Sequence, residues 1–163
     1  MDGMRYLLDT CVICETMKPM PDENVLAWFS SVDDRELFLS TVVLGEVLKG
    51  ILLLPMSRRR TAFENWFRES VELSFVGRVL SFDSQVAKVW AERCAIAELN
   101  GHPRAVADSM IAATSLRYGM TLVTRNIKDV DYMGVELLNP FEFRLFGEMQ
   151  HGDQLSSSRV EAV

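Results

Sequence analysis

Short apolar runs that alternate with helical patterns constrain the fold of this chain more than any other feature of its sequence. The runs cover residues 6–8, 37–39, 78–82, 121–124 and 135–138. Runs of this length, bounded by turn-forming residues, are typical of buried strands. Because strands joined through helices form right-handed βαβ units, the sequence predicts an α/β fold. We expect a three-layer α/β/α sandwich with a mostly parallel five-stranded sheet.

The segments between these runs carry signals for helix starts and stops. Small polar side chains precede several apolar helical stretches, and glycine or proline follows them. We expect helices over residues 12–18, 22–32 and 57–75. Three more helices are expected: one from a Ser40-Thr41 cap to Pro55, one from Asp83-Ser84 to Asn100-Gly101, and one from Pro103 to Gly119. Residues 125–131 are predicted to form a polar turn.

Length and charge limit the organisation of the chain and its partners. A chain of 163 residues with 48% hydrophobic content is the size of one globular domain with a real core. The composition turns polar and serine-rich near the end, so we expect a domain over residues 1–146 and a polar, disordered tail over 147–163. A net charge of −6 excludes a large basic surface that would adsorb nucleic acid or anionic membrane broadly.

The sequence favours a cytoplasmic protein without a membrane segment. The first residues lack the basic and hydrophobic regions of a signal peptide. The most apolar stretch, residues 42–54, is interrupted by Glu46 and Lys49 and is too short to cross a bilayer. Three cysteines, an odd number, argue against a disulfide framework and suit a reducing compartment.

Two acidic residues follow predicted strands. Asp9 comes directly after the first run, and Asp129 lies in the turn after the fourth. In open α/β sheets the ligand crevice lies beyond the carboxyl ends of the strands. Taken alone, Asp9 is explained as a helix cap and Asp129 as an exposed turn residue beside Lys128. Together they are expected to be neighbours at one edge of the sheet.

Two further acids interrupt helical stripes that otherwise resemble a protein core. A desolvated carboxylate is costly unless it is protonated, paired or bound to a cation. A carboxylate cluster of hard oxygen ligands favours Mg²⁺ or Mn²⁺. These acids are Glu46, which shares a face with Val42, Val43, Gly50 and Leu53, and Asp108, which shares one with Ile111, Ala112 and Ser115.

From about residue 5 to 143 the sequence resembles the PIN-domain ribonucleases, and within them the VapC-type toxins of type II toxin–antitoxin pairs. Two segments, residues 78–83 and 138–141, look most like the FitB-like subgroup. The motifs are Leu7-Leu8-Asp9-Thr10, Ser40-Thr41-Val42-Val43-Leu44-Gly45-Glu46, Ala107-Asp108-Ser109-Met110-Ile111-Ala112-Ala113-Thr114 and Thr124-Arg125-Asn126-Ile127-Lys128-Asp129.

The resemblance implies a divalent-metal-dependent endoribonuclease with Asp9, Glu46 and Asp108 as core acids. The family places its fourth acid where Asn126 or Asp129 stands, and we favour Asp129, with Asn126 as a supporting polar ligand. The family commonly has Asn where this chain has Cys11. We therefore expect an altered hydrogen bond near Asp9.

The chemistry implied is activation of water by bound metal, without a protein nucleophile. Asp9 and Asp108 are assigned as metal ligands, Glu46 as a ligand or as the residue that orients the attacking water, and Asp129 as a second-metal or outer ligand. Thr10 and Thr124 hold these ligands in place. Candidate RNA contacts are Lys49, Arg125, Lys128 and residues 58–60.

The resemblance also implies a cognate antitoxin that blocks the site and helps to repress transcription. Operator DNA is then contacted only through the antitoxin complex. An apolar face on the helices between Asp22 and Phe75 would suit a homodimer and an antitoxin-binding groove.

Two other functions compete with this hypothesis. Cys11-Val12-Ile13-Cys14 follows a strand and opens a helix, as the motif of a thioredoxin-like thiol redox protein does. The redox hypothesis leaves Glu46 and Asp108 unexplained. The other alternative is a catalytically idle PIN-like module that only binds its partner.

Overall fold

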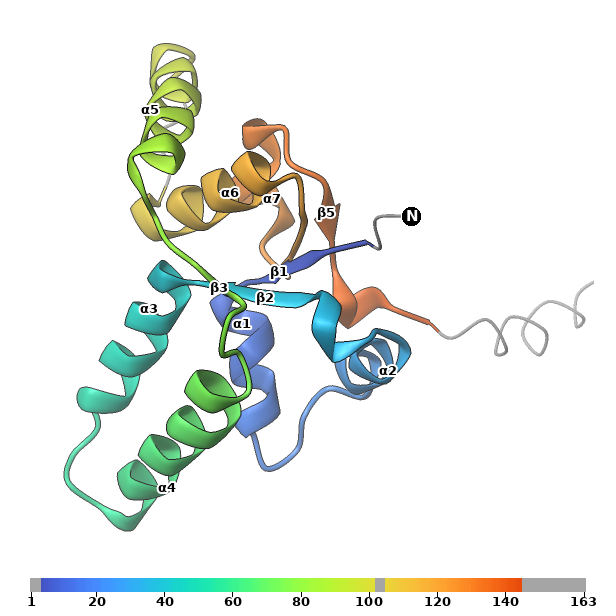
Figure 1. Cartoon of the computed structure of the whole chain (residues 1–163), viewed down its shortest axis with the longest axis vertical. Coiled ribbons are helices and arrows are strands. Elements are labelled where there is room, and N and C mark those ends of the chain that lie inside the picture. The colour runs from blue at the N-terminus through green and yellow to red at the C-terminus, as the bar shows by residue number, and fades with distance from the viewer. Residues whose placement is uncertain (1–3, 102–104, 145–163) are drawn as a thin grey trace, which may run out of the picture.

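A computed structural model of the chain describes residues 4–101 and 105–144, which fold around a five-stranded sheet (Figure 1). The strand order is β3-β2-β1-β4-β5, and every neighbouring pair is parallel. The predicted fold class is therefore confirmed, with a sheet that is parallel throughout. The third and fifth strands are shorter than predicted. The strands are β1 (Tyr6–Leu8), β2 (Leu37–Ser40), β3 (Val79–Leu80), β4 (Thr121–Val123) and β5 (Leu137–Leu138).

Helices cover both faces of the sheet. Figure 1 shows α1 to α4 on one face and α5 to α7 on the other. The longer helices are α2 (Glu23–Ser31), α3 (Thr41–Leu52), α4 (Arg58–Trp66) continued by the π-helical η3 (Phe67–Leu73), α5 (Ser84–Leu99) and α6 (Val106–Tyr118). The short ones are α1 (Thr10–Ile13), α7 (Ile127–Val130) and the 3-10 turns η1 (Cys14–Met17), η2 (Asp34–Glu36), η4 (Asp131–Met133) and η5 (Pro140–Glu142).

The strand order creates a topological switch point between β1 and β4. The chain runs outward from β1 through β2 to β3, and then returns to place β4 on the other side of β1. Connections after β1 and β4 therefore leave toward opposite faces of the sheet (Figure 1). In open α/β sheets such a point opens a crevice beyond the carboxyl ends of the strands. Asp9 and Thr124 directly follow these two strands.

Three predicted helix boundaries are confirmed. The buried Ser40 caps α3, because its Oγ accepts a hydrogen bond of 3.2 Å from the Val43 N–H. Asp83 caps α5, and α6 ends at Gly119, whose φ of 61° is the left-handed conformation that favours glycine. The predicted start at Pro103 and the predicted tail over 147–163 lie outside the described residues.

Two local predictions were wrong. Residues 125–131, predicted as a polar turn, instead contain α7 and the start of η4. Residues 12–18 do not form one helix, since the chain coils from Thr10 through α1 and η1 and becomes extended at Lys18. Lys18 precedes Pro19, and a residue before proline is sterically driven out of the helical region.

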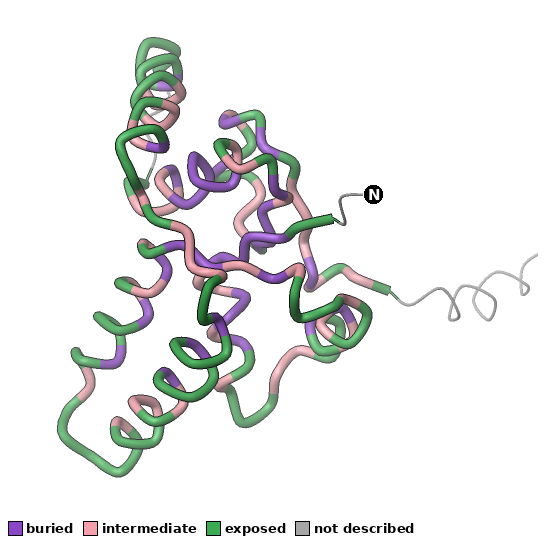
Figure 2. The backbone as a smooth tube through the Cα atoms, viewed as in Figure 1, coloured by how far each residue is buried: buried purple, intermediate pink, exposed green. Residues whose placement is uncertain are grey.

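The buried face of α3 differs from the predicted one. Val43, Val47 and Ile51 point inward at four-residue spacing, whereas Leu53 is 77% exposed. Leu53 is the C-cap of α3 and lies beyond Ile51, the last buried residue of the helix. Glu46 lies beside the buried stripe and is half-buried. Figure 2 shows buried residues gathered on the central strands and on the helix faces turned toward them.

Within residues 4–101 and 105–144, no helix is both long and apolar enough to cross a membrane.

Arg78 ties together two segments at the β3 edge of the sheet. Its guanidinium donates to the carbonyl of Leu37 at 2.6 Å and also to the carbonyls of Asp34 and Ser74. The same group lies over the Phe75 ring, 4.8 Å from its centroid. The segments before β2 and before β3 are therefore joined through one half-buried cation.

Replacement of Arg78 by alanine is expected to lower the free energy of unfolding by about 2 kcal/mol, because several charge-assisted hydrogen bonds are lost together. Urea unfolding followed by circular dichroism measures this change. Arg68→Ala removes a cation that is 62% exposed and is the matched control, expected to change stability by less than about 0.5 kcal/mol. Equal effects of the two variants would contradict the role given to Arg78.

Candidate active site

Asp9 is held at the switch point by both strands that flank it. Its backbone N–H donates to the Val123 carbonyl at 3.0 Å, which extends the pairing of β1 with β4. The side chain is 6% exposed; Oδ1 accepts from the Thr10 N–H and Oδ2 from the Thr124 hydroxyl, each at 2.6 Å. Asp9 thus caps α1 and also fixes a buried carboxylate at the carboxyl edge of the sheet.

Thr124 is itself held in place by its surroundings. Its N–H donates to the Leu138 carbonyl at 2.9 Å, and its Oγ1 accepts from the Asn126 N–H at 2.9 Å. Because an ionised carboxylate only accepts hydrogen bonds, the Thr124 hydroxyl donates its proton to Asp9 while its oxygen accepts from Asn126. The predicted supporting role of Thr124 has a geometric basis here, and Asn126 contributes through its backbone.

Glu46 reaches the same edge from α3. Its Oε2 accepts a hydrogen bond of 2.6 Å from the Thr10 hydroxyl. The Thr10 N–H also donates to Asp9, so Thr10 holds both carboxylates. The role predicted for Thr10, to hold metal ligands in place, stays a prediction.

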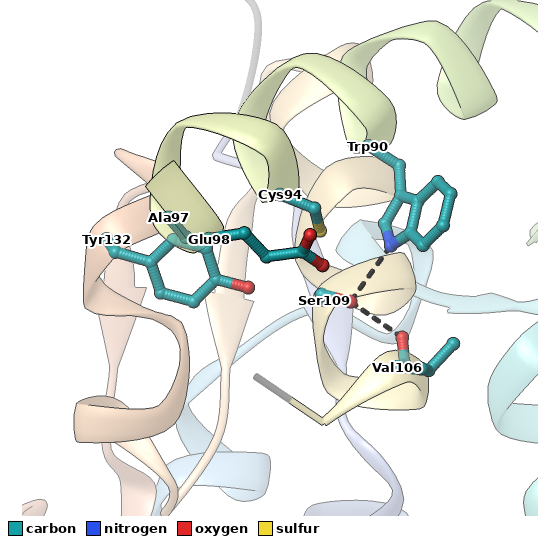
Figure 3. Close-up of a pocket in the computed structure, with 7 residues that line it drawn as sticks. All are labelled: Trp90, Cys94, Ala97, Glu98, Val106, Ser109 and Tyr132. Atoms are coloured by element: carbon teal, nitrogen blue, oxygen red, sulfur yellow. Dashed lines mark hydrogen bonds between the residues drawn. The ribbon is translucent and has the colours of Figure 1, made fainter. Parts of the chain in front are cut away.

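Asp108 is placed by the packing of α6 on α5. The Trp90 Nε1–H donates to the Ser109 hydroxyl at 2.9 Å, and that hydroxyl donates to the Val106 carbonyl at 2.7 Å (Figure 3). These bonds tie the first turn of α6 to α5. Asp108 lies in that turn, directly before Ser109.

The four predicted acids interact electrostatically. The pKa of the Asp108 carboxyl is raised, first by burial and then by the negative charges of Asp9, Glu46 and Asp129. Asp129, in α7, is exposed at the rim. Four carboxylates from different elements therefore share one region of negative potential.

The donor set fits a hard divalent cation. Its ligands would be carboxylate oxygens, which Mg²⁺ and Mn²⁺ prefer, and the raised pKa of Asp108 marks a position that a positive charge would stabilise. Among the described residues, no three acidic, histidine or cysteine side chains are already drawn into a closed cage. Asp9 and Glu46 are linked through Thr10, whose backbone N–H donates to Asp9 and whose hydroxyl donates to Glu46.

Cys11 bridges the two strand-end turns. Its thiol donates to Asp9 Oδ2 at 3.4 Å, and its Sγ accepts from the Arg125 N–H at 3.5 Å. The expected change near Asp9 is therefore a thiol bond to the carboxylate. Burial, together with the negative charge of Asp9, raises the pKa of both Cys11 and Cys14 to about 11. A redox-active thiol requires the opposite shift, so the thioredoxin-like alternative is disfavoured.

A separate small cavity lies between α5, α6 and η4 (Figure 3). Its volume of about 40 Å³ suits a few water molecules and is far too small for a nucleotide. None of the four acids lines it. Its lining residues are Trp90, Cys94, Ala97, Glu98, Val106, Ser109 and Tyr132.

The comparisons with known proteins agree with this fold. The PIN domain family matches residues 6–131. The VapC ribonuclease Y4jK of Sinorhizobium fredii is 35% identical over 136 residues, which are 83% of this chain and 97% of that relative. The toxin FitB of Neisseria gonorrhoeae is 33% identical over 135 residues, again 83% of this chain and 97% of the relative.

A solved structure of FitAB bound to an IR36 DNA fragment is similar, with a TM-score of 0.80 and 33% identity over 86% of this chain and 99% of that one. The chain belongs to the PIN domain family. The resemblance to VapC-type and FitB-like proteins that the motifs indicated is confirmed.

Two features of the site were missed by sequence reasoning. The Trp90–Ser109 bond that orders the turn carrying Asp108 was not foreseen, although Ser109 directly follows an acid inside a predicted helix. The contact of Cys11 with the Arg125 N–H was also missed, because it joins residues more than a hundred positions apart. Neither contact leaves a local pattern in the sequence.

Asp108→Asn is expected to stabilise the metal-free protein. A raised carboxyl pKa means that ionisation opposes folding, so this cost is absent below the ordinary aspartate pKa of about 3.9 and develops as pH rises through the higher folded value. At pH 7 without divalent cations the variant should melt about 2 °C higher, and the difference should vanish at low pH.

Differential scanning calorimetry over a pH series measures both features. Asp34→Asn, which changes an exposed acid on η2, is the control and should leave the melting temperature within about 1 °C. A lower melting temperature for Asp108→Asn at pH 7 would contradict the proposed repulsion.

Proposed function

We propose that this protein is the toxin of a type II toxin–antitoxin pair and acts as a divalent-metal-dependent endoribonuclease. The observation that carries the proposal is the placement of the hydrogen-bonded carboxylates of Asp9 and Glu46 at the switch point of the sheet, with the negative charges of both and of Asp129 acting on Asp108. The relatives support the class of activity, since one of them is named a ribonuclease and another a toxin.

In this mechanism Asp9 and Asp108 would hold Mg²⁺ or Mn²⁺. Such a cation would activate a water molecule and neutralise the charge that builds on the phosphate. Thr124 and Thr10 fix Asp9 and Glu46, respectively, each through a hydrogen bond of 2.6 Å. Glu46 orients the attacking water and accepts its proton.

Asp129 and Asn126 take unequal roles in this proposal. Asp129 contributes its charge to the potential at Asp108, whereas Asn126 donates its backbone N–H to Thr124. We assign Asp129 as the fourth acid, acting as an outer or second-metal ligand. Asn126 supports the site mainly through its backbone.

A protein partner is part of the proposal. Leu52, Leu53 and Met56, at the end of α3 and in the connection to α4, are 51%, 77% and 82% exposed. Exposed apolar groups of this kind suit a partner segment, which we assign to a cognate antitoxin. Since the chain carries a net charge of −6, operator DNA is reached through the antitoxin complex, as the FitAB structure with DNA suggests by analogy. We propose a homodimer as the toxin's own assembly.

Asp9→Asn should reduce Mg²⁺-dependent cleavage of a mixed-sequence single-stranded RNA by at least about a hundredfold, because a charged ligand is lost. Gel analysis of a labelled RNA, with and without EDTA, measures the loss. The matched control is Asp22→Asn, which changes another helix-capping aspartate, on α2 and outside the cluster.

The control should cleave at the wild-type rate. Undiminished cleavage by Asp9→Asn would sink the mechanism. A wild-type protein that cleaves no RNA with Mg²⁺ or Mn²⁺, yet binds its antitoxin, would instead favour the catalytically idle module.

The fourth acid is tested by a pair of substitutions in one turn. Asp129→Asn should lower kcat/KM about tenfold and raise the Mg²⁺ concentration needed for half-maximal rate, because it removes charge at the rim. Asn126→Ala keeps the backbone N–H that binds Thr124 and should change either quantity less than about threefold. The reverse order of effects, measured by initial rates over an Mg²⁺ series, would assign the fourth ligand to Asn126.

A further inference from the structure

A cation–aromatic pair lies at the same edge of the sheet as the four acids. The guanidinium of Arg125 lies over the ring of Phe141, 4.8 Å from its centroid. Arg125 is the second residue after β4, and Phe141 is the third after β5. These strands are parallel and paired with Val123 opposite Leu138, so both residues emerge at the carboxyl edge, beside Asp9.

The backbone on each side of this pair is fixed. The Arg125 N–H donates to Cys11 Sγ at 3.5 Å, which ties it to the turn after Asp9. The Phe141 N–H donates to Asn139 Oδ1 at 3.2 Å, and the Phe141 carbonyl accepts from the Asn24 amide at 2.8 Å. The ring is half-buried against the core. The pair is therefore positioned before any ligand arrives.

The N–H donors of the Arg125 guanidinium are available to a ligand. Arg125 is exposed, and in the described part of the chain its guanidinium makes no hydrogen bond or ion pair. Arg78 also lies over a phenylalanine ring, but its N–H groups donate to backbone carbonyls. A planar cation with one face on an aromatic ring leaves its other face and its N–H edge for a second planar group or a phosphate.

We propose that Arg125 and Phe141 form a platform on which a nucleobase of the RNA stacks next to the phosphate to be cleaved. This inference rests on the proposed ribonuclease activity and specifies how that site takes its substrate. Single-stranded RNA is bound by stacking of bases on aromatic rings and guanidinium planes, together with cationic contacts to the backbone. A local cation beside the acids also offsets the repulsion between a polyanion and a chain of net charge −6.

Stacking on this platform predicts little sequence preference at the base concerned. Every base presents a π-face, so stacking binds different bases with similar strength. The platform therefore specifies single-stranded or looped RNA rather than a particular nucleotide. Base-paired RNA, whose bases are already stacked on each other, would not use it.

The experiment compares three substitutions at the platform with one matched control. Arg125→Ala removes both charge and plane, Arg125→Lys keeps the charge but loses the plane, and Phe141→Leu keeps the cation but removes the ring. The control is Arg117→Ala, which removes a cation lying 5.9 Å from the centroid of the Tyr118 ring. Arg117 precedes β4 and so lies at the opposite edge of the sheet.

Binding is measured with full-length protein and short RNA oligonucleotides that carry 2-aminopurine at successive positions. Stacking quenches the fluorescence of this base, so the readout reports the contact itself. Asp9→Asn serves as the common background to prevent cleavage, and thermal melting checks that each variant is folded. The same substitutions in the active protein give KM and kcat.

We expect Arg125→Ala and Phe141→Leu to weaken binding about tenfold, with loss of quenching at one position and an increase mainly in KM. Arg125→Lys should lose the quenching while keeping part of the affinity, and Arg117→Ala should match the parent within about twofold. If the parent quenches no position, or if all platform variants quench as the parent does, the platform is wrong although cleavage stands. If wild-type protein neither cleaves nor binds RNA, the proposed function itself fails.

Discussion

The hydrogen bond from the Thr124 hydroxyl to Asp9 Oδ2, at 2.6 Å, is the contact on which the rest of the site depends. It joins the carboxyl ends of β1 and β4, the two strands at which the chain reverses the direction of sheet growth. Asn126 and Leu138 fix Thr124 through its Oγ1 and its N–H, so the turns after β4 and β5 are tied to the same carboxylate. The hydrogen bonds that Asp9 accepts offset part of the cost of burying its carboxylate. This arrangement holds the carboxylate in a fixed position at the carboxyl edge of the sheet.

Repulsion among the carboxylates is the second constraint: it lowers the stability of the folded protein at the site where a ligand would bind. Among the described residues Asp108 gains no comparable hydroxyl partner, and burial followed by three other acids raises its pKa. A metal-free protein therefore retains unfavourable electrostatic energy in its folded state, as proteins commonly do at sites built for binding. The scaffold tolerates this energy because rigid neighbours hold the acids apart. The Trp90–Ser109 bond fixes the turn that carries Asp108, and the Ser40 cap fixes the helix that carries Glu46.

Much of the fold could be read from the sequence, because strands and caps leave local patterns. Tyr6–Leu8 and the Ser40 cap were predicted to the residue or nearly so. The predicted face of α3 was wrong at Leu53, since the direction of a helix face depends on where the sheet lies. The four acids were predicted from their order along the chain, and the raised pKa of Asp108 supports their proximity. The contact of Arg125 with Phe141 was not predicted, because it requires the register of β4 with β5.

The chemistry at the carboxyl edge of the sheet depends on the order in which the negative charges of the acids and of the phosphates are neutralised. Before a cation binds, the four acids repel the phosphates of any nucleic acid, and the net charge of −6 adds to this repulsion. A bound divalent cation reverses the local potential at the acids but does not orient a flexible single strand. Orientation requires a contact that is independent of the metal, and a stacked base supplies it without adding negative charge. In the proposed function, the acids and the neighbouring cation–aromatic pair would therefore serve separate tasks: the acids would bind the metal at the phosphate, and the pair would set which phosphate reaches it.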